Sequence, residues 1–175
     1  MHVRSLRNTI VGMRTFESMQ ALIQELEGDA TELDRLLSRN TTAWERIERG
    51  ADHPVDWGAL GFTIQTLYSV LENYFLRISR YFENDLPADR WHMALVERME
   101  LEIPGVRPAV LQSPEQTKQV REILRFRHRL RNLYGEDLDP QKTADVQRTV
   151  EEFFADFPSL HAAFVEKLRR IADVL

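Results

Sequence analysis

The stretch LGFTIQTLYSVLENYFLRISRY, residues 60–81, decides the fold class. Its apolar residues recur at alternating spacings of four and three, which is typical of one face of an α-helix packed lengthwise against other helices. These positions are Leu60, Ile64, Leu67, Leu71, Tyr74, Ile78 and Tyr81. Phe75 and Phe82 widen the apolar stripe, so we expect more than one neighbouring helix to pack against it. The stretch therefore predicts a long helix inside a bundle.

Prolines divide the rest of the chain into further helical segments, because proline ends or starts helices more readily than it continues them. The region before residue 50 repeats the apolar spacing more weakly, and Gly28 is the position where a helix there would be weakest. A short helix is expected around 88–100, a non-helical crossing over 101–112 and a helix over 114–134. Two more helices are expected to follow and to meet at Pro158.

The chain as a whole reads as all-α, because no stretch alternates apolar and polar residues over the length of a strand. We predict a single-domain antiparallel helical bundle. Residues 1–19 are expected to form an N-terminal helical arm or the start of the first helix, and residues 20–175 the domain itself.

Capping residues support the limits expected for the helix over 114–134. Ser113 is a favourable N-cap, Pro114 suits the first helical position, and Gln116 lies three residues after the cap. Gly135 is expected to be the C-cap, since glycine adopts the left-handed conformation that often ends a helix.

Composition excludes several classes of function. The formal net charge is −5, so nucleic-acid binding would need a local basic patch. The absence of cysteine excludes disulfides, thiolate metal sites and cysteine nucleophiles. Glycine-rich phosphate loops, His-Glu-x-x-His and Gly-x-Ser-x-Gly are all missing, and we expect no cofactor and no metal.

The location predicted from the sequence is cytoplasmic. The first residues, MHVRSLRNTIVG, lack the continuous apolar stretch of a secretory signal. The longest apolar-rich segment, 57–81, should not span a membrane, because it is interrupted by Gln65, Glu72, Asn73 and Arg77.

The helix over 114–134 has an arginine on its apolar side. A projection at 100° per residue places Arg127 in the middle of the stripe, with Arg131 close by and with His128 and Asn132 along one edge. The stripe itself comprises Val120, Ile123, Leu124, Leu130 and Tyr134. A guanidinium in such a position is costly unless it is paired or faces a wet cleft.

Two interpretations of this arginine follow from the residues alone. It is either a structural arginine that meets a carboxylate from another helix, or part of an anion site that binds phosphate. Residues 118–131 contain six basic residues and one acid, which favours phosphate or an RNA backbone. We therefore predict that Arg125, Arg129 and Arg131 bind RNA phosphates. His92, beside Trp91, and His161 are expected to be structural or surface residues.

The segment FRHRLRNLYGEDLDP, residues 126–140, resembles the signature of HepT-like proteins, toxins of the HEPN ribonuclease group. Their pattern is arginine, a polar residue, three more, histidine, one residue and tyrosine. Arg127, His128 and Tyr134 match its arginine, polar and tyrosine places. The upstream block WHMALVERMELEIPGVRPAVLQ, residues 91–112, also resembles one HepT-like subfamily, and the similarity extends from about residue 20 to the C-terminus.

One position departs from the pattern, because Asn132 stands where the family has its histidine. The resemblance implies metal-independent cleavage of RNA, with Arg127 steadying the phosphate and the histidine assisting proton transfer. An asparagine cannot titrate near neutrality. The chain is therefore expected to be weak or inactive as a ribonuclease unless His128 substitutes. Either the chain is a naturally weakened member, or the histidine was replaced so that a toxic protein could be made.

The resemblance also implies partners. HepT-like toxins are homodimers whose two motifs line a shared cleft, and their MntA-like minimal nucleotidyltransferase antitoxins attach AMP to the motif tyrosine. Tyr134 is the expected site of this AMPylation. From the residues alone, it is expected to be an aromatic residue of the core whose hydroxyl contacts solvent. The function expected is the toxin of a type VII-like toxin–antitoxin pair. The alternatives are a non-catalytic protein that binds RNA or the nucleotidyltransferase, and an unrelated four-helix interaction module.

Overall fold

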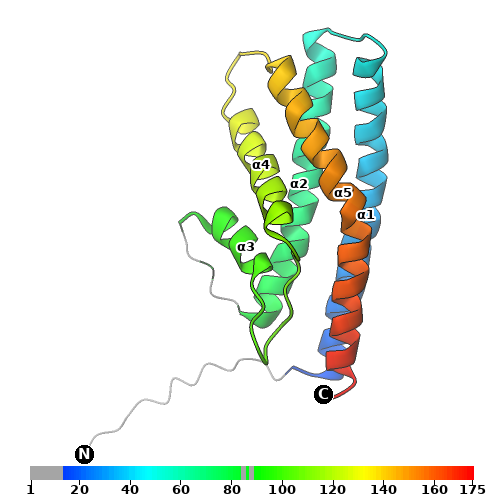
Figure 1. Ribbon diagram of the computed structural model, residues 1–175, viewed down its shortest axis with the longest axis vertical. Coiled ribbons are helices and arrows are strands. Elements are labelled where there is room, and N and C mark those ends of the chain that lie inside the picture. Colours follow the sequence, from blue (N-terminus) through cyan, green and yellow to red (C-terminus); the bar gives the residue numbers. More distant parts are fainter. Residues whose placement is uncertain (1–13, 84–85, 87–88) are drawn as a thin grey trace, which may run out of the picture.

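The computed structural model describes residues 14–83, 86 and 89–175, and this part of the chain consists of α-helices and the loops between them. The helices are α1 (Phe16–Glu48), α2 (Pro54–Phe82), α3 (Trp91–Glu100), α4 (Pro114–Arg131) and α5 (Pro140–Ala172). The four long helices alternate in direction, while α3 is short and lies at one side (Figure 1). The predicted all-α antiparallel bundle is confirmed. Over the same residues, no helix has the length and apolar character needed to cross a bilayer.

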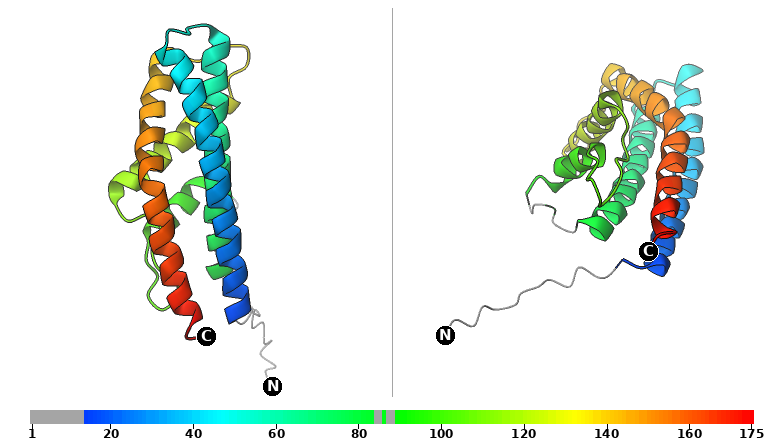
Figure 2. Two further views of the ribbon diagram at one scale, coloured as in Figure 1. Left: turned by 90° about the vertical axis from the view of Figure 1, so that its right-hand side faces the viewer. Right: turned by 60° about the horizontal axis from the view of Figure 1, so that its bottom comes forward.

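Helix α2 is the centre of the bundle, since it contacts each of the other four helices. The stripe predicted from the sequence is fully buried from Leu60 to Ile78, and Tyr81 at its end is partly buried. Phe75 and Phe82 are buried as well, as the widened stripe predicts. Helices α1 and α5 run side by side (Figure 2), and α4 packs against both α2 and α5.

Helix α4 begins as predicted but ends earlier than predicted. The Ser113 hydroxyl accepts a hydrogen bond from the backbone of Gln116, and Pro114 is the first helical residue. The helix stops at Arg131, with Asn132 as its C-cap. The side-chain amide of Asn132 donates to the carbonyl oxygen of His128 at 2.9 Å. In a longer helix this oxygen would accept a backbone N–H, so the side chain takes the place of a backbone hydrogen bond at the helix end. Gly135 is therefore not the C-cap; with φ of 76° it forms a turn in the loop that follows.

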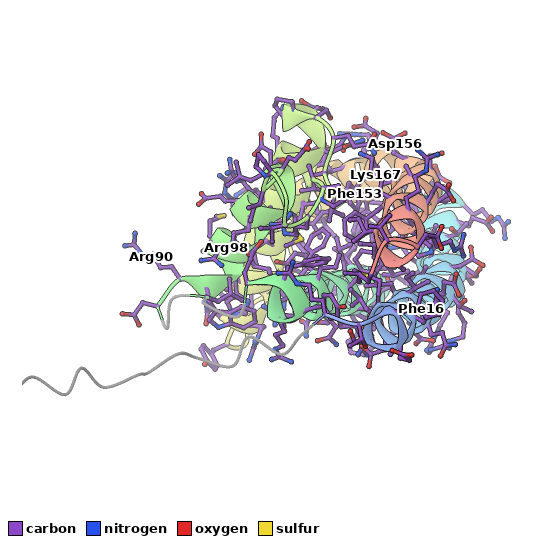
Figure 3. All side chains as sticks on the ribbon, turned by 90° about the horizontal axis from the view of Figure 1, so that it is seen from below. Phe16, Arg90, Arg98, Phe153, Asp156 and Lys167 are labelled. Atoms are coloured by element: carbon purple, nitrogen blue, oxygen red, sulfur yellow. The ribbon has the colours of Figure 1, made fainter. Side chains whose placement is uncertain are left out.

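The break expected at Pro158 is wrong, because α5 runs through this proline. An internal proline removes one backbone hydrogen bond and typically costs about 3 kcal/mol. Buried Phe154, Phe157 and Leu160 continue the apolar face on both sides of Pro158, so packing outweighs the local cost. The axis of α5 changes direction part-way along its length (Figure 1). Phe153 of the same helix points into the interior of the bundle (Figure 3).

The N-terminal arm predicted for residues 1–19 lies largely outside the described residues, which begin at Arg14. Thr15 caps α1, so residues 16–19 are the first turn of that helix. Gly28 does not interrupt α1. The Arg14 guanidinium donates to the carbonyl oxygen of Phe82 at 3.0 Å and joins the start of α1 to the end of α2.

The predicted non-helical crossing joins α3 to α4 and is held by a buried arginine. The Arg107 side chain is fully enclosed; its Nε donates to the Glu83 carboxylate at 2.6 Å, and its Nη1 donates to the carbonyl oxygen of Leu101. These contacts fix the end of α3 relative to α2. Arg90 precedes α3 in the left-handed conformation and points away from the bundle (Figure 3).

Candidate functional site

Arg127 on α4 and Glu72 on α2 form an ion pair in the interior of the bundle. The distance from Arg127 Nη2 to Glu72 Oε1 is 3.6 Å, and the two side chains are 10% and 7% exposed. The Arg127 guanidinium also lies over the Tyr68 ring, 5.5 Å from its centre. Burial of Tyr68 and the nearby negative charge of Glu72 raise the pKa of its hydroxyl, while Arg127 opposes this. The geometry matches the structural interpretation, in which the arginine meets a carboxylate from another helix.

The ion pair leaves part of the guanidinium without a partner. Nε and Nη1 of Arg127 are buried and make no hydrogen bond within the described residues. A buried donor left unpaired costs about 1–3 kcal/mol, and more when it is charged. These two groups can therefore donate to a small acceptor that reaches them, such as a water or a phosphate oxygen.

Glu72 holds a second group besides Arg127. Its Oε2 lies 2.5 Å from Nδ1 of His92, the second residue of α3, whose ring stacks on Trp91 with 3.7 Å between ring centres. When Nδ1 donates to the carboxylate, Nε2 is the ring nitrogen left for proton transfer. One carboxylate on α2 thus connects α3 to α4.

His128 stands next to this group on the surface of α4. Its ring is 5.4 Å from the His92 ring, in an edge-to-face arrangement. Partial burial is the main cause that lowers the pKa of His128, and the positive charges of His92, Arg127 and Arg131 lower it further, while Glu72 opposes them. These surroundings favour the neutral ring of His128.

The last two residues of the motif lie beyond the regular helix. Asn132 is exposed, and its amide is engaged with the backbone of its own helix. Tyr134 was expected on the apolar stripe of the helix, but α4 ends first and the side chain is 88% exposed. Its hydroxyl is reachable from solvent, whereas Tyr68 and Tyr74 are fully buried.

A family model described as HepT-like protein matches residues 59–168, more than half of the chain. The chain belongs to the HepT-like family. The matched range of this HepT-like chain runs from α2 into α5 and contains Glu72, His92 and the segment 127–134. No curated protein and no solved structure matches the chain.

The other arginines predicted to bind phosphate lie on the surface of α4. Arg125, Arg129 and Arg131 are all exposed. Arg129 lines a cavity of about 220 Å³ against the start of α5, together with Lys142. Arg131 is near His128, as its effect on the pKa of His128 indicates.

Sequence reasoning missed the two side chains around Arg127. Glu72 was taken only as an interruption of the apolar segment, and His92 as a structural or surface residue. A signal for Glu72 was present, because it lies one turn before Phe75 and Leu76 and one turn after Tyr68, on the widened side of the stripe. A carboxylate in that position needs a cation from a neighbouring helix. His92 had no such signal, since it lies on a different helix.

Proposed function

We propose that this HepT-like chain is the toxin of a type VII-like toxin–antitoxin pair, acting in the cytoplasm as a metal-independent ribonuclease. Its catalysis is impaired because Asn132 occupies the histidine place of the family motif. Asparagine keeps a hydrogen-bonding side chain there but cannot exchange a proton near neutral pH.

One observation carries the proposal: the buried Arg127 has two N–H groups without a partner in the described part of the chain. A phosphate oxygen is a good acceptor for either nitrogen, and charge-assisted hydrogen bonds of this kind are strong. The side chain is 10% exposed, but Nε and Nη1 are themselves covered, so a phosphate oxygen reaches them only when the side chains around Arg127 move apart. Family membership supports the same chemistry.

The proposal includes two protein partners. A second copy of the chain pairs with the first to bring both motifs to a shared cleft, and a minimal nucleotidyltransferase transfers AMP to Tyr134. The 88% exposure of this tyrosine in the loop after α4 supports the second partner. By light scattering, the protein is expected at about twice its 20.6 kDa.

A second candidate function is non-catalytic binding of RNA or of the nucleotidyltransferase by the same surface. The observation that favours it is the Asn132 amide, which is occupied in capping α4. Both candidate functions use the basic surface of α4. They differ in that the second includes no cleavage of RNA.

The test is to incubate the purified protein with RNA in EDTA and to measure binding and strand cleavage together. Salt-sensitive binding with slow cleavage supports the ribonuclease. Binding without cleavage, in the native chain and in Asn132→His alike, supports the binding protein. Absence of RNA binding at low salt contradicts both.

A further inference from the structure

We infer that His92 and His128 are a proton-transfer pair for RNA cleavage, and that Glu72 positions them. This inference rests on the ribonuclease proposed above and names groups that would still move protons in a chain with Asn132. It assigns catalytic work to α3, which lies outside the family motif.

The pair is assembled from separate parts of the fold. His92 is the second residue of α3 and His128 lies in the last turn of α4, and their rings are 5.4 Å apart. A group that gives or takes a proton must come within about 2.6–3.2 Å of the atom concerned. Two imidazole rings at this separation can reach different oxygens of one phosphodiester. Both are also accessible, since the His92 side chain is 23% exposed and His128 is exposed.

Glu72 is a positioning residue in this arrangement. Its carboxylate accepts the Nδ1 hydrogen of His92 at 2.5 Å. The Trp91 ring stacks on the His92 ring and restricts its rotation. A carboxylate in this relation fixes the tautomer and orientation of a histidine and stabilises its imidazolium form. Arg127 keeps Glu72 in place through the ion pair at 3.6 Å.

The two histidines suit different roles because their surroundings differ. Around His128, partial burial and the charges of His92, Arg127 and Arg131 favour the neutral ring, with only Glu72 opposing them. His92 has its Nδ1 held by the carboxylate of Glu72, which leaves Nε2 as the nitrogen that can meet the substrate. We therefore assign the base to His128 and the acid to His92.

The reaction needs no further reactant. His128 takes the proton of a ribose 2′-hydroxyl as the 2′-oxygen forms a bond to phosphorus. The bond from phosphorus to the 5′-oxygen of the next nucleotide breaks, and His92 gives its Nε2 proton to that oxygen. The products are a 2′,3′-cyclic phosphate and a 5′-hydroxyl, and a proton returned from His128 to His92 through solvent restores the pair.

The experiment measures single-turnover RNA cleavage in EDTA by the full-length native chain, His92→Gln, His128→Gln and Glu72→Gln, each checked for folding by circular dichroism. His161→Gln is the matched control, since His161 is a partly buried histidine on α5, outside this group. Glutamine keeps a polar side chain but cannot carry a proton. His128 is exposed, so its replacement leaves the core intact.

We expect His92→Gln and His128→Gln each to lower the rate by about 10²–10⁴-fold, with RNA binding unchanged and His161→Gln near the native rate. Fragments should end in a cyclic phosphate, and a 2′-deoxy substitution at the cleaved position should stop the reaction. Glu72→Gln should lower the rate with RNA binding unchanged, because His92 loses the carboxylate that orients it, and the double variant Glu72→Gln/His92→Gln should be no slower than His92→Gln alone. A purely structural Glu72 would make the double variant slower still.

Three results overturn the inference. In the first, the native chain cleaves at a rate that neither His92→Gln nor His128→Gln alters; in the second, the native chain is inert while Asn132→His cleaves. Both of these outcomes leave the proposed ribonuclease standing. Absence of cleavage in the native chain and in Asn132→His removes the proposed function together with the inference.

Discussion

Arg127 and Glu72 face each other across the interface of α4 and α2, 3.6 Å apart and both at least nine-tenths enclosed. The same carboxylate contacts His92 of α3. The arginine on the apolar face of α4 is thus one end of a charged cluster that joins three helices. Its unpaired N–H groups connect this structural role to the proposed binding of phosphate.

Removal of Arg127 should destabilise the fold strongly. Arg127→Ala leaves the Glu72 carboxylate buried without its cation, and breaking a buried pair in this way typically costs about 3–5 kcal/mol. Urea denaturation monitored by circular dichroism measures the free energy of unfolding. Arg125→Ala, at an exposed position on the same helix, is the control and should stay within about 0.5 kcal/mol of the native protein. Equal effects of the two substitutions would show that the pair does not stabilise the interior.

The exposed arginines of α4 should determine how RNA binding depends on salt. Each phosphate contact to a single strand contributes about 0.7 to the slope of log K against log salt, because it releases counterions. Replacing Arg125, Arg129 or Arg131 by alanine should reduce the slope by about that amount wherever the arginine contacts RNA. Arg170→Ala, at an exposed position on α5, is the control. Unchanged slopes for all three variants would exclude this face of α4 as the RNA-binding surface.

Tyr134 should be the tyrosine that accepts AMP. Its side chain is 88% exposed, whereas the hydroxyls of Tyr68 and Tyr74 lie on fully buried residues. Incubation with ATP, magnesium and a cognate nucleotidyltransferase should add the mass of AMP to the native chain and none to Tyr134→Phe. Mass spectrometry of peptides locates the modification, and AMP on Tyr81 alone would refute the assignment.

Stability should fall as the pH is lowered below about 6.5, the ordinary pKa of histidine. Burial is the main cause that lowers the pKa of His161, Arg169 adds to the effect, and Glu27 opposes it. The unfolded chain therefore binds a proton at this position at a higher pH than the folded chain does, so protonation favours unfolding. Urea denaturation between pH 5 and 7.5 should show a smaller loss in His161→Gln than in the native protein. An identical pH dependence in both would mean that His161 titrates normally in the folded state.

The helical architecture was predictable because it depends on a periodic pattern. The apolar stripe of α2 and the cap at Ser113 are local signals, and both appear in the structure as expected. The two errors arose where another interaction outweighed the local signal. Packing on both sides of Pro158 keeps α5 continuous, and the Asn132 cap ends α4 before Gly135.

The candidate site was only half predictable. Arg127 and His128 share a helix, so their relation follows from the sequence. Their relation to Glu72 and His92 depends on how α2, α3 and α4 pack together, which no local spacing encodes. A buried arginine predicts that some carboxylate must approach it, but not which one.

The most direct test of the proposed function is the rate of RNA cleavage in EDTA by the native chain and by Asn132→His, compared under single-turnover conditions with both proteins folded. A restored proton-transfer group should raise the rate by about 10²–10⁴-fold and should inhibit growth when Asn132→His is expressed alone. Arg127→Ala on that background should abolish both effects. A native chain that already cleaves as fast as Asn132→His would contradict the role given to position 132. Absence of cleavage in Asn132→His, despite RNA binding, would show that the chain is a binding protein.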